Sequence, residues 1–232
     1  MTTADETEQA DAKGYGQYCP ISRAVEVLGE RWSLLIVRDM LCGATRFNEL
    51  ARCNPRLSRT LLSKRLRQLE GAGIVERSGE QYLLTASGRE LEPLVFGLGE
   101  WGAKWQFDEP RETELDPELL MWWVHTRLDF SHLPERRLVL EFHFSDRRER
   151  YWILRDGQGP SVCSTDPGFE VDALIASDLS TMYQVWMGKL ALGTAIHSER
   201  VRVSGLPAIV RRLPQLFELS PIADRVAAVT KR

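Results

Sequence analysis

Apolar positions recur at helical spacing through the first third of the chain. One stripe begins after Pro20, a residue suited to a first helical turn, and runs to Gly43, a typical C-cap. Its members are Ile21, Ala24, Val25, Leu28, Trp32, Leu35, Ile36 and Met40. A short second helix is expected at about 46–51, and a third at 58–71.

The third predicted helix carries two start signals. Ser58 has a side chain suited to an N-cap, and Leu57 with Leu62 stands at the positions of a hydrophobic staple. Its two faces differ in chemistry. The inward stripe is Leu62, Leu66 and Leu69, and the opposite face carries Thr60, Ser63, Lys64 and Arg67.

Two short strands, at about 74–77 and 81–84, follow around a glycine turn. The order helix, helix, helix, hairpin predicts a winged helix-turn-helix, whose third helix enters the major groove of DNA. Cations there meet phosphates or guanine edges, and small hydroxyls permit close approach. The alternative for the polar face is an ordinary solvated helix surface.

A further apolar stripe spans about 86–106 and includes Trp101 and Trp105. A small three-helix core cannot cover two tryptophans on one face, so a second subunit is expected to bury them. The alternative is packing against a second domain of the same chain.

The segment 107–117, rich in charge and holding two prolines, is predicted to be a linker. The predicted organisation is a disordered tail at 1–17, a DNA-binding and dimerisation domain at 18–106, and an α+β domain at 118–232 in which helices cover a sheet. Its helices are expected at 116–133, 178–187 and 206–219, and its strands at 138–144, 151–155, 161–164, 171–176 and 196–203.

Charge is unevenly distributed along the 232 residues. The whole chain holds 30 Lys plus Arg against 33 Asp plus Glu, which argues against binding of polyanions by the entire surface. Between Arg46 and Arg67, however, seven basic residues accompany one acid, Glu49. An acidic first stretch without an apolar run does not resemble a signal peptide, and no window is apolar enough to cross a membrane, so a soluble, cytoplasmic protein is expected.

Five segments together resemble the HxlR family of bacterial winged-helix transcription regulators. They read YCP (18–20), LGERWSLLI (28–36), RFNEL (46–50), LLSKRLRQLE (61–70) and YLLTASG (82–88). The resemblance covers about residues 18–106 and implies a homodimer on a pseudo-palindromic operator of double-stranded DNA, with 58–71 as recognition helix and 77–81 as wing tip. The candidate DNA contacts are Arg46, Arg56, Ser58, Arg59, Thr60, Ser63, Lys64, Arg67 and Arg77.

The later segments YWILRDG (151–157), VDALIASD (171–178) and 188–214 resemble the sterol-carrier-protein-like fold. That resemblance implies an apolar tunnel between sheet and helices, and hence an apolar small-molecule effector. The candidate wall residues are Phe142, Phe144, Trp152, Met182, Trp186 and Leu190. The alternative is that these side chains fill a core.

Chemistry of other kinds has little support. Cys19 precedes a predicted helix start, where backbone N–H groups favour a thiolate, and several HxlR relatives sense oxidants with a cysteine here; a structural or idle thiol is the alternative. The four cysteines and four histidines lack metal-ligand spacing, so neither metal nor cofactor is expected. Catalytic motifs are absent from the sequence, which predicts a non-enzyme. The rival hypothesis is a carrier or enzyme for lipids or apolar small molecules that keeps the winged helix only for dimerisation.

Overall fold

The computed structural model describes residues 14–133, 135–157 and 159–230. The chain forms two compact units, one up to Gly97 and one from Leu98 onward, so the division falls inside a helix and before the predicted linker at 107–117. Most of the predicted tail, residues 1–13, lies outside the described part. Residues 14–17 belong to neither a helix nor a strand.

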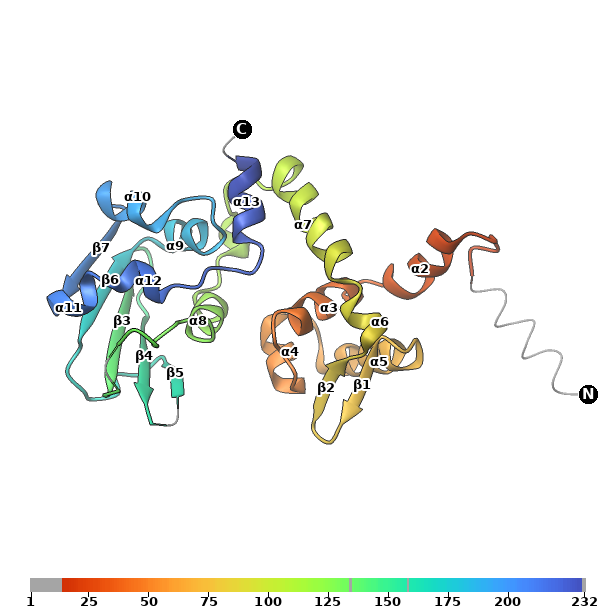
Figure 1. The fold of residues 1–232 in the computed structure, drawn as a ribbon, viewed down its shortest axis with the longest axis horizontal. Coiled ribbons are helices and arrows are strands. Elements are labelled where there is room, and N and C mark those ends of the chain that lie inside the picture. Colours follow the sequence, from red (N-terminus) through yellow and green to blue (C-terminus); the bar gives the residue numbers. More distant parts are fainter. Residues whose placement is uncertain (1–13, 134, 158, 231–232) are drawn as a thin grey trace, which may run out of the picture. The chain divides into compact units, whose positions relative to one another are not determined.

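The first unit is a helical body with a two-stranded wing (Figure 1). Its elements are α2 (Pro20–Leu28), α3 (Ser33–Leu41), α4 (Phe47–Cys53), α5 (Arg59–Gly71), β1 (Val75–Ser78), β2 (Gln81–Leu84), α6 (Ala86–Arg89) and the start of α7 (Glu92–Trp105). Buried aliphatic side chains from α3, α4 and α5 make its core: Ile36, Leu50, Leu62, Leu66 and Leu69. The predicted winged helix-turn-helix order is confirmed.

The first apolar stripe is divided between two helices, whereas the sequence pattern predicts one stripe as far as Gly43. The break lies at 29–32, where the Gly29 N–H donates to the Val25 carbonyl and closes α2. Trp32 then adopts a φ of 82°, a left-handed conformation that ends helical continuity. As a result α3 enters the core, and none of the residues of α2 is buried.

Helix α5 begins and ends where the sequence predicts. The Ser58 hydroxyl accepts a hydrogen bond from the Leu61 N–H at 3.3 Å, and both Leu57 and Leu62 are buried. At the other end, Gly73 has a φ of 70°, and the Ile74 N–H returns to the Leu69 carbonyl. The rotation of α5 about its axis is therefore set by its caps and its leucines together.

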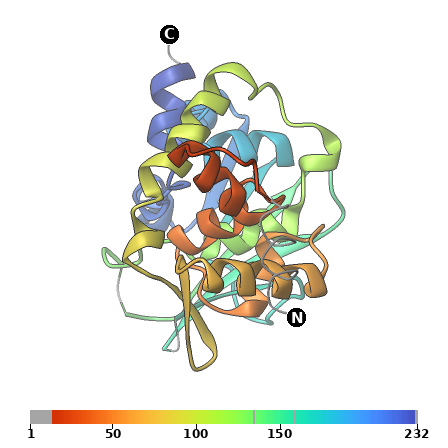
Figure 2. The same cartoon turned by 90° about the vertical axis from the view of Figure 1, so that its right-hand side faces the viewer.

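The wing is a tight antiparallel hairpin of β1 and β2 (Figures 1 and 2). Ser78 pairs with Gln81 across a two-residue loop. Gly79 in that loop has a φ of 60°. The hairpin is fastened to the start of α4, because the Tyr82 N–H donates to the Thr45 carbonyl at 2.7 Å and Arg46 forms a β-bridge with Gln81. The wing and the helix-turn-helix are thus one body.

The second unit is a two-layer α+β structure (Figure 1). After α7 its elements are the 3-10 helix η1 (Glu112–Glu114), α8 (Pro117–His125), β3 (Leu138–Phe144), β4 (Arg150–Asp156), β5 (Gly159–Cys163), β6 (Ala173–Ser177), α9 (Leu179–Trp186), α10 (Leu192–His197), β7 (Val201–Gly205), α11 (Pro207–Val210), α12 (Leu213–Leu216) and α13 (Ala223–Thr230). In the described residues, the strands of this sheet lie in the order β5-β4-β3-β6-β7, and only the pair β3 and β6 is parallel.

One face of this sheet carries the helices. Phe142 of β3 pairs with Tyr151 of β4 and Ile175 of β6, and all three are buried in one apolar cluster with side chains of α8, α9, α10, α11 and α12. Alternation along each strand sends the intervening residues, such as Trp152, to the opposite face. The α+β prediction is confirmed at this level.

Some predicted elements of the second unit differ from the structure. The helix predicted at 116–133 ends at His125, and the strand predicted at 196–203 starts only at Val201 because Ile196 and His197 complete α10. The single helix predicted at 206–219 is two short helices, the second with Pro214 in its first turn. Helix α13 was not predicted. It packs so closely on the end of α9 that a Cβ on Gly188 would lie 2.4 Å from the Ala223 carbonyl oxygen.

Candidate nucleic-acid interface

The outward face of α5 is the most basic helical surface of the first unit. Thr60, Lys64 and Arg67 are exposed and Ser63 is half-buried, while Leu62 and Leu66 on the opposite side are buried. In the described part of the chain, neither Lys64 nor Arg67 forms an ion pair with an acidic side chain. Their charge is directed to solvent or to a partner.

The N-terminal end of α5 adds positive potential to this face. Ser58 caps only one of the first N–H groups, and the first turn contains no acidic residue. The open end of such a helix favours phosphate groups. A hollow of about 620 Å³ lies between α4 and this end of α5. Its lining is Asn48, Ala51, Arg52, Pro55, Leu57, Ser58 and Arg59.

Arg59 is held in a fixed direction at the edge of this hollow. Its guanidinium donates to the Asn48 side-chain oxygen at 3.0 Å and lies 5.7 Å from the centre of the Phe47 ring. Asn48 was not among the predicted site residues. Periodicity within α5 cannot reveal the contact between Asn48 and Arg59, because Asn48 belongs to the preceding helix, α4.

The remaining predicted contacts lie on the turn and the wing. Arg56 is exposed in the turn between α4 and α5, and Arg46 is exposed where the wing joins α4. Arg77, on β1, donates to the Gly79 carbonyl at 3.1 Å and lies over the Tyr82 ring at 5.7 Å. The wing tip therefore presents a cation oriented by its own hairpin.

Arg65 has a different role from the other cations between Arg46 and Arg67. Its side chain is buried on the inner side of α5, and its Nη2 lies 2.6 Å from a Glu30 carboxylate oxygen. It also donates to the Arg31 carbonyl at 2.9 Å and to Gln68 at 2.7 Å. One of the seven basic residues counted along the sequence thus anchors α5 to the turn before α3 and does not belong to the exposed face.

A buried carboxylate fixes the two helices that precede α5. Asp39 is fully buried on α3, where it accepts hydrogen bonds from Arg38 at 2.9 and 2.7 Å and from the Asn54 amide at 2.5 Å. Burial raises the pKa of Asp39 above its ordinary value, against the opposing effect of Arg38 and Asn54. Because Asn54 ends α4, this network sets the angle between α3 and α4.

Cys19 lies where the sequence placed it, immediately before α2. Backbone hydrogen bonds to the thiol from Ser22 and Ile21 lower the pKa of Cys19 below its ordinary value. The thiol is half-exposed, and Cys163 and Cys42 are likewise partly exposed, whereas Cys53 is buried. The geometry of Cys19 thus favours its thiolate.

The six candidate wall residues of the second unit do not share one surface. Phe142, Phe144, Met182 and Trp186 are buried in the helix-covered core, and Leu190 packs against it. Trp152 is also buried but lies on the opposite face of the sheet, where it pairs with Glu141. Because the pairing of β3 with β4 puts Trp152 and Phe142 on opposite faces of the sheet, the six residues do not line one tunnel.

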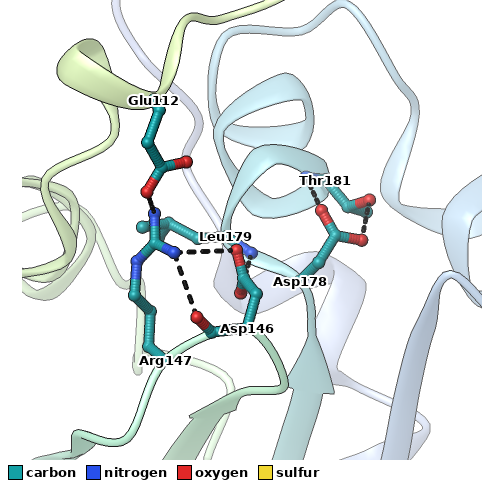
Figure 3. Close-up of polar contacts among 6 residues, drawn as sticks. All are labelled: Glu112, Asp146, Arg147, Asp178, Leu179 and Thr181. Atoms are coloured by element: carbon teal, nitrogen blue, oxygen red, sulfur yellow. Dashed lines mark hydrogen bonds and ion pairs between the residues drawn. The ribbon is translucent and has the colours of Figure 1, made fainter.

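The segment 107–117, predicted as a linker, is fastened within the second unit. Figure 3 shows Arg147 between Glu112 and Asp146, at 2.6 and 3.3 Å, while Asp146 also accepts a hydrogen bond from the Leu179 N–H at the start of α9. Asp178 caps the same helix through the Thr181 N–H. Arg147 thus ties the segment before α8 to the turn after β3.

No helix within residues 14–133, 135–157 and 159–230 is both long and apolar enough to cross a membrane. Nor does any group of three or more His, Cys, Asp or Glu side chains have an arrangement that would hold a metal ion.

Known proteins resemble the part of the chain that contains this interface. The sequence pattern of the HxlR-like helix-turn-helix family matches residues 27–110. The HTH-type transcriptional regulator sll1512 of Synechocystis is 36% identical over 107 residues, which cover 43% of this chain and 79% of that protein. YybR of Bacillus subtilis, also an HTH-type transcriptional regulator, is 37% identical over 91 residues, which cover 36% and 73%.

Solved structures match the same region. The quinone-bound YodB of B. subtilis has 35% sequence identity and a TM-score of 0.34, and the match covers 36% of this chain and 96% of that one. The redox regulator HypR in its oxidised form has 35% identity and a TM-score of 0.36, with coverage of 39% and 100%.

The buried anchor generates a stability prediction. Replacing Arg65 with Met leaves the Arg31 carbonyl and Glu30 without this partner, so the first unit should lose about 1–3 kcal/mol of unfolding free energy. Arg67→Met, two positions along the same helix, is the matched control and should change stability by less than about 0.5 kcal/mol. Calorimetric unfolding of both variants checks this; equal transitions would show that the anchor contributes nothing.

Proposed function

Because the chain belongs to the HxlR-like helix-turn-helix family of transcriptional regulators, we propose that its first unit binds duplex DNA with α5 in the major groove. Relatives named as HTH-type transcriptional regulators agree with the prediction that the chain is not an enzyme. The observation that carries the proposal is the exposed polar face of α5, opposite its buried leucines.

The proposed contacts divide by position. Thr60, Ser63, Lys64 and Arg67 face the bases and the phosphates beside them, while Ser58 and the N–H groups at the start of α5 meet a phosphate. Arg59, oriented by Asn48, and Arg56 bind the backbone next to the turn. Arg46 and Arg77 bind the backbone or minor groove on the wing side.

A second copy of the chain would complete the DNA-binding unit. Four large apolar side chains on one stripe of α7 are more than half exposed, from 54% to 61%: Leu94, Leu98, Trp101 and Trp105. An exposed stripe of this size is typical of a subunit interface. Two α5 helices related by a two-fold axis, about 34 Å apart, would then read a pseudo-palindromic operator in the cytoplasm.

The second unit is proposed to hold an apolar small-molecule effector, lipid-like or aromatic. The two-layer arrangement of a sheet under several helices supports this, and the α9 residues Met182 and Trp186 of the predicted wall lie in its core. Binding there would change DNA affinity, and DNA would change effector affinity by the same factor.

Thiol sensing by Cys19 is a second candidate function, and it is compatible with the first. It is favoured by the lowered pKa of this half-exposed thiol at the start of α2. Helix α2 leads directly into the turn whose Glu30 and Arg31 hold Arg65 of α5. A modified Cys19 could therefore influence the recognition helix through α2 and the non-covalent contacts of Glu30 and Arg31 with Arg65.

Loss of either exposed cation on α5 should weaken DNA binding. We expect Lys64→Ala and Arg67→Ala each to lower affinity and to reduce the slope of log affinity against log salt concentration by about one unit, because one phosphate contact is lost. Titration of a selected genomic fragment at several salt concentrations measures both. Arg211→Ala, an exposed arginine of the second unit, is the control and should leave the slope unchanged. Unchanged slopes in both α5 variants would remove the proposal.

The stripe on α7 should control the oligomeric state. Trp101→Asp places a charge in the proposed interface and should weaken dimerisation by about 30-fold or more, as expected for a central aromatic residue. Sedimentation equilibrium gives the dissociation constants, with Leu206→Asp, at a similarly exposed leucine of the second unit, as control. A parent protein that is monomeric at micromolar concentration would contradict the dimer.

Cys19 should be the most reactive cysteine near neutral pH. A lowered pKa leaves more thiolate at pH 7, so iodoacetamide should label Cys19 before Cys42, and p-benzoquinone should add to the same sulfur and change DNA affinity. Peptide mass spectrometry follows the labelling, and a DNA titration follows the response. Cys42→Ser is the control and should keep the parent's change in DNA affinity. If Cys19→Ser also keeps it, Cys19 is not a sensor.

A further inference from the structure

A cavity of about 270 Å³ lies in the second unit, between α9 and the segment that follows α7. Its apolar walls include Phe107 and Met187, and its polar walls include Glu109, Gln184 and Lys189. None of these residues was predicted as part of a site. Small-molecule sites of this kind combine apolar walls with a few directed polar groups.

The segment over the cavity is fastened at its far end. The Tyr183 hydroxyl donates to the Asp116 carbonyl at 2.8 Å, and Glu112 is paired with Arg147 at 2.6 Å (Figure 3). Burial raises the pKa of Tyr183 far above its ordinary value, so this phenol stays protonated and keeps donating. The segment thus forms a strap across α9, with residues 107–111 as the wall of the cavity.

The near end of the strap is held mainly by the Glu109 carboxylate, beside a longer contact of Lys189 with the Phe107 carbonyl. Glu109 accepts hydrogen bonds from the Gln184 amide at 2.5 Å and from the Lys189 ammonium at 3.2 Å. The side chain of Lys189 is only 19% exposed, whereas that of Glu109 is 70% exposed. A largely buried cation is therefore neutralised by a carboxylate that solvent can reach.

The two donors are preorganised toward the cavity. Arg200 donates to the Gln184 side-chain oxygen at 3.1 Å, which leaves the amide nitrogen directed at Glu109. The Lys189 ammonium lies 5.8 Å from the centre of the Phe107 ring and 3.5 Å from its carbonyl oxygen. Two fixed donors beside an aromatic wall match the outline of an aromatic ring that carries a carboxylate.

We propose that this cavity binds a small aromatic carboxylate whose carboxylate replaces that of Glu109 on Lys189 and Gln184, with its ring against Phe107 and Met187. The exchange conserves the charge around Lys189, and displacing Glu109 costs little because its carboxylate, already 70% exposed, is solvated by water once released. At the Lys189 end of the cavity an amine is disfavoured, because the two groups that hold the Glu109 carboxylate there, the Gln184 amide and the Lys189 ammonium, are both donors.

The site deepens the proposed function, on which its regulatory role rests. Glu109 lies four residues after the end of α7, the helix proposed as subunit interface. Release of Glu109 removes the main polar contact at the near end of the strap, so that binding at α9 can reach the dimer interface along the chain. Because binding is measured without DNA, failure of the site and failure of DNA recognition are separate results.

The first experiment compares isosteric probes on the full chain. Benzoate and 3-phenylpropionate should bind in a calorimetric or NMR titration. Benzamide, which lacks the charge, should have an affinity at least about tenfold lower than that of benzoate. Failure of both carboxylates to bind, equal affinity for benzamide, or preferential binding of phenethylamine would each overturn the proposal.

Variants then test the exchange itself. Lys189→Met should abolish benzoate binding, and Lys189→Arg should restore part of it, which separates loss of charge from loss of fold. Glu109→Gln removes the competing carboxylate and should strengthen benzoate binding by about tenfold. Asp108→Asn is the matched control, because it removes one negative charge from the same cavity without touching the Lys189 pair. An equal increase of benzoate affinity in Glu109→Gln and Asp108→Asn would show a general effect of charge and would contradict the proposed exchange.

Discussion

The burial of one side of α5 decides what its other side presents. Leu62, Leu66 and Leu69 are fully covered by the first unit, and Arg65 is drawn down to Glu30 and the Arg31 carbonyl. Successive residues on a helix are about 100° apart, so rotating α5 by one residue would bury Lys64 and expose a leucine. The apolar cost of that rotation, roughly 2 kcal/mol for each leucine, keeps the basic face outward.

Two adjacent cations in this helix have opposite roles, and sequence periodicity alone did not separate them. Lys64 is exposed, whereas Arg65 is buried with a partner that lies 35 residues earlier. Features that depend on neighbouring residues follow the sequence prediction: the Ser58 cap, the buried pair Leu57 and Leu62, and the hairpin around Gly79. Pairings across many residues leave no such local trace.

The second unit shows the same limit. Alternation predicted β3 and β4, but the register that places Phe142 and Trp152 on opposite faces became visible only with the pairing of Glu141 and Trp152. The segment 107–117 reads as a linker from its charges and prolines, yet those charges meet Lys189 and Arg147, more than 30 residues away. Its role in a cavity therefore depends on contacts that composition cannot reveal.

The central claim is that α5 reads duplex DNA, and a structure of the full chain bound to a genomic fragment that it selects tests this most directly. The account predicts α5 in the major groove, with Lys64 and Arg67 on bases or phosphates and Arg65 still against Glu30. A complex in which another element contacts the DNA and α5 faces solvent would contradict it.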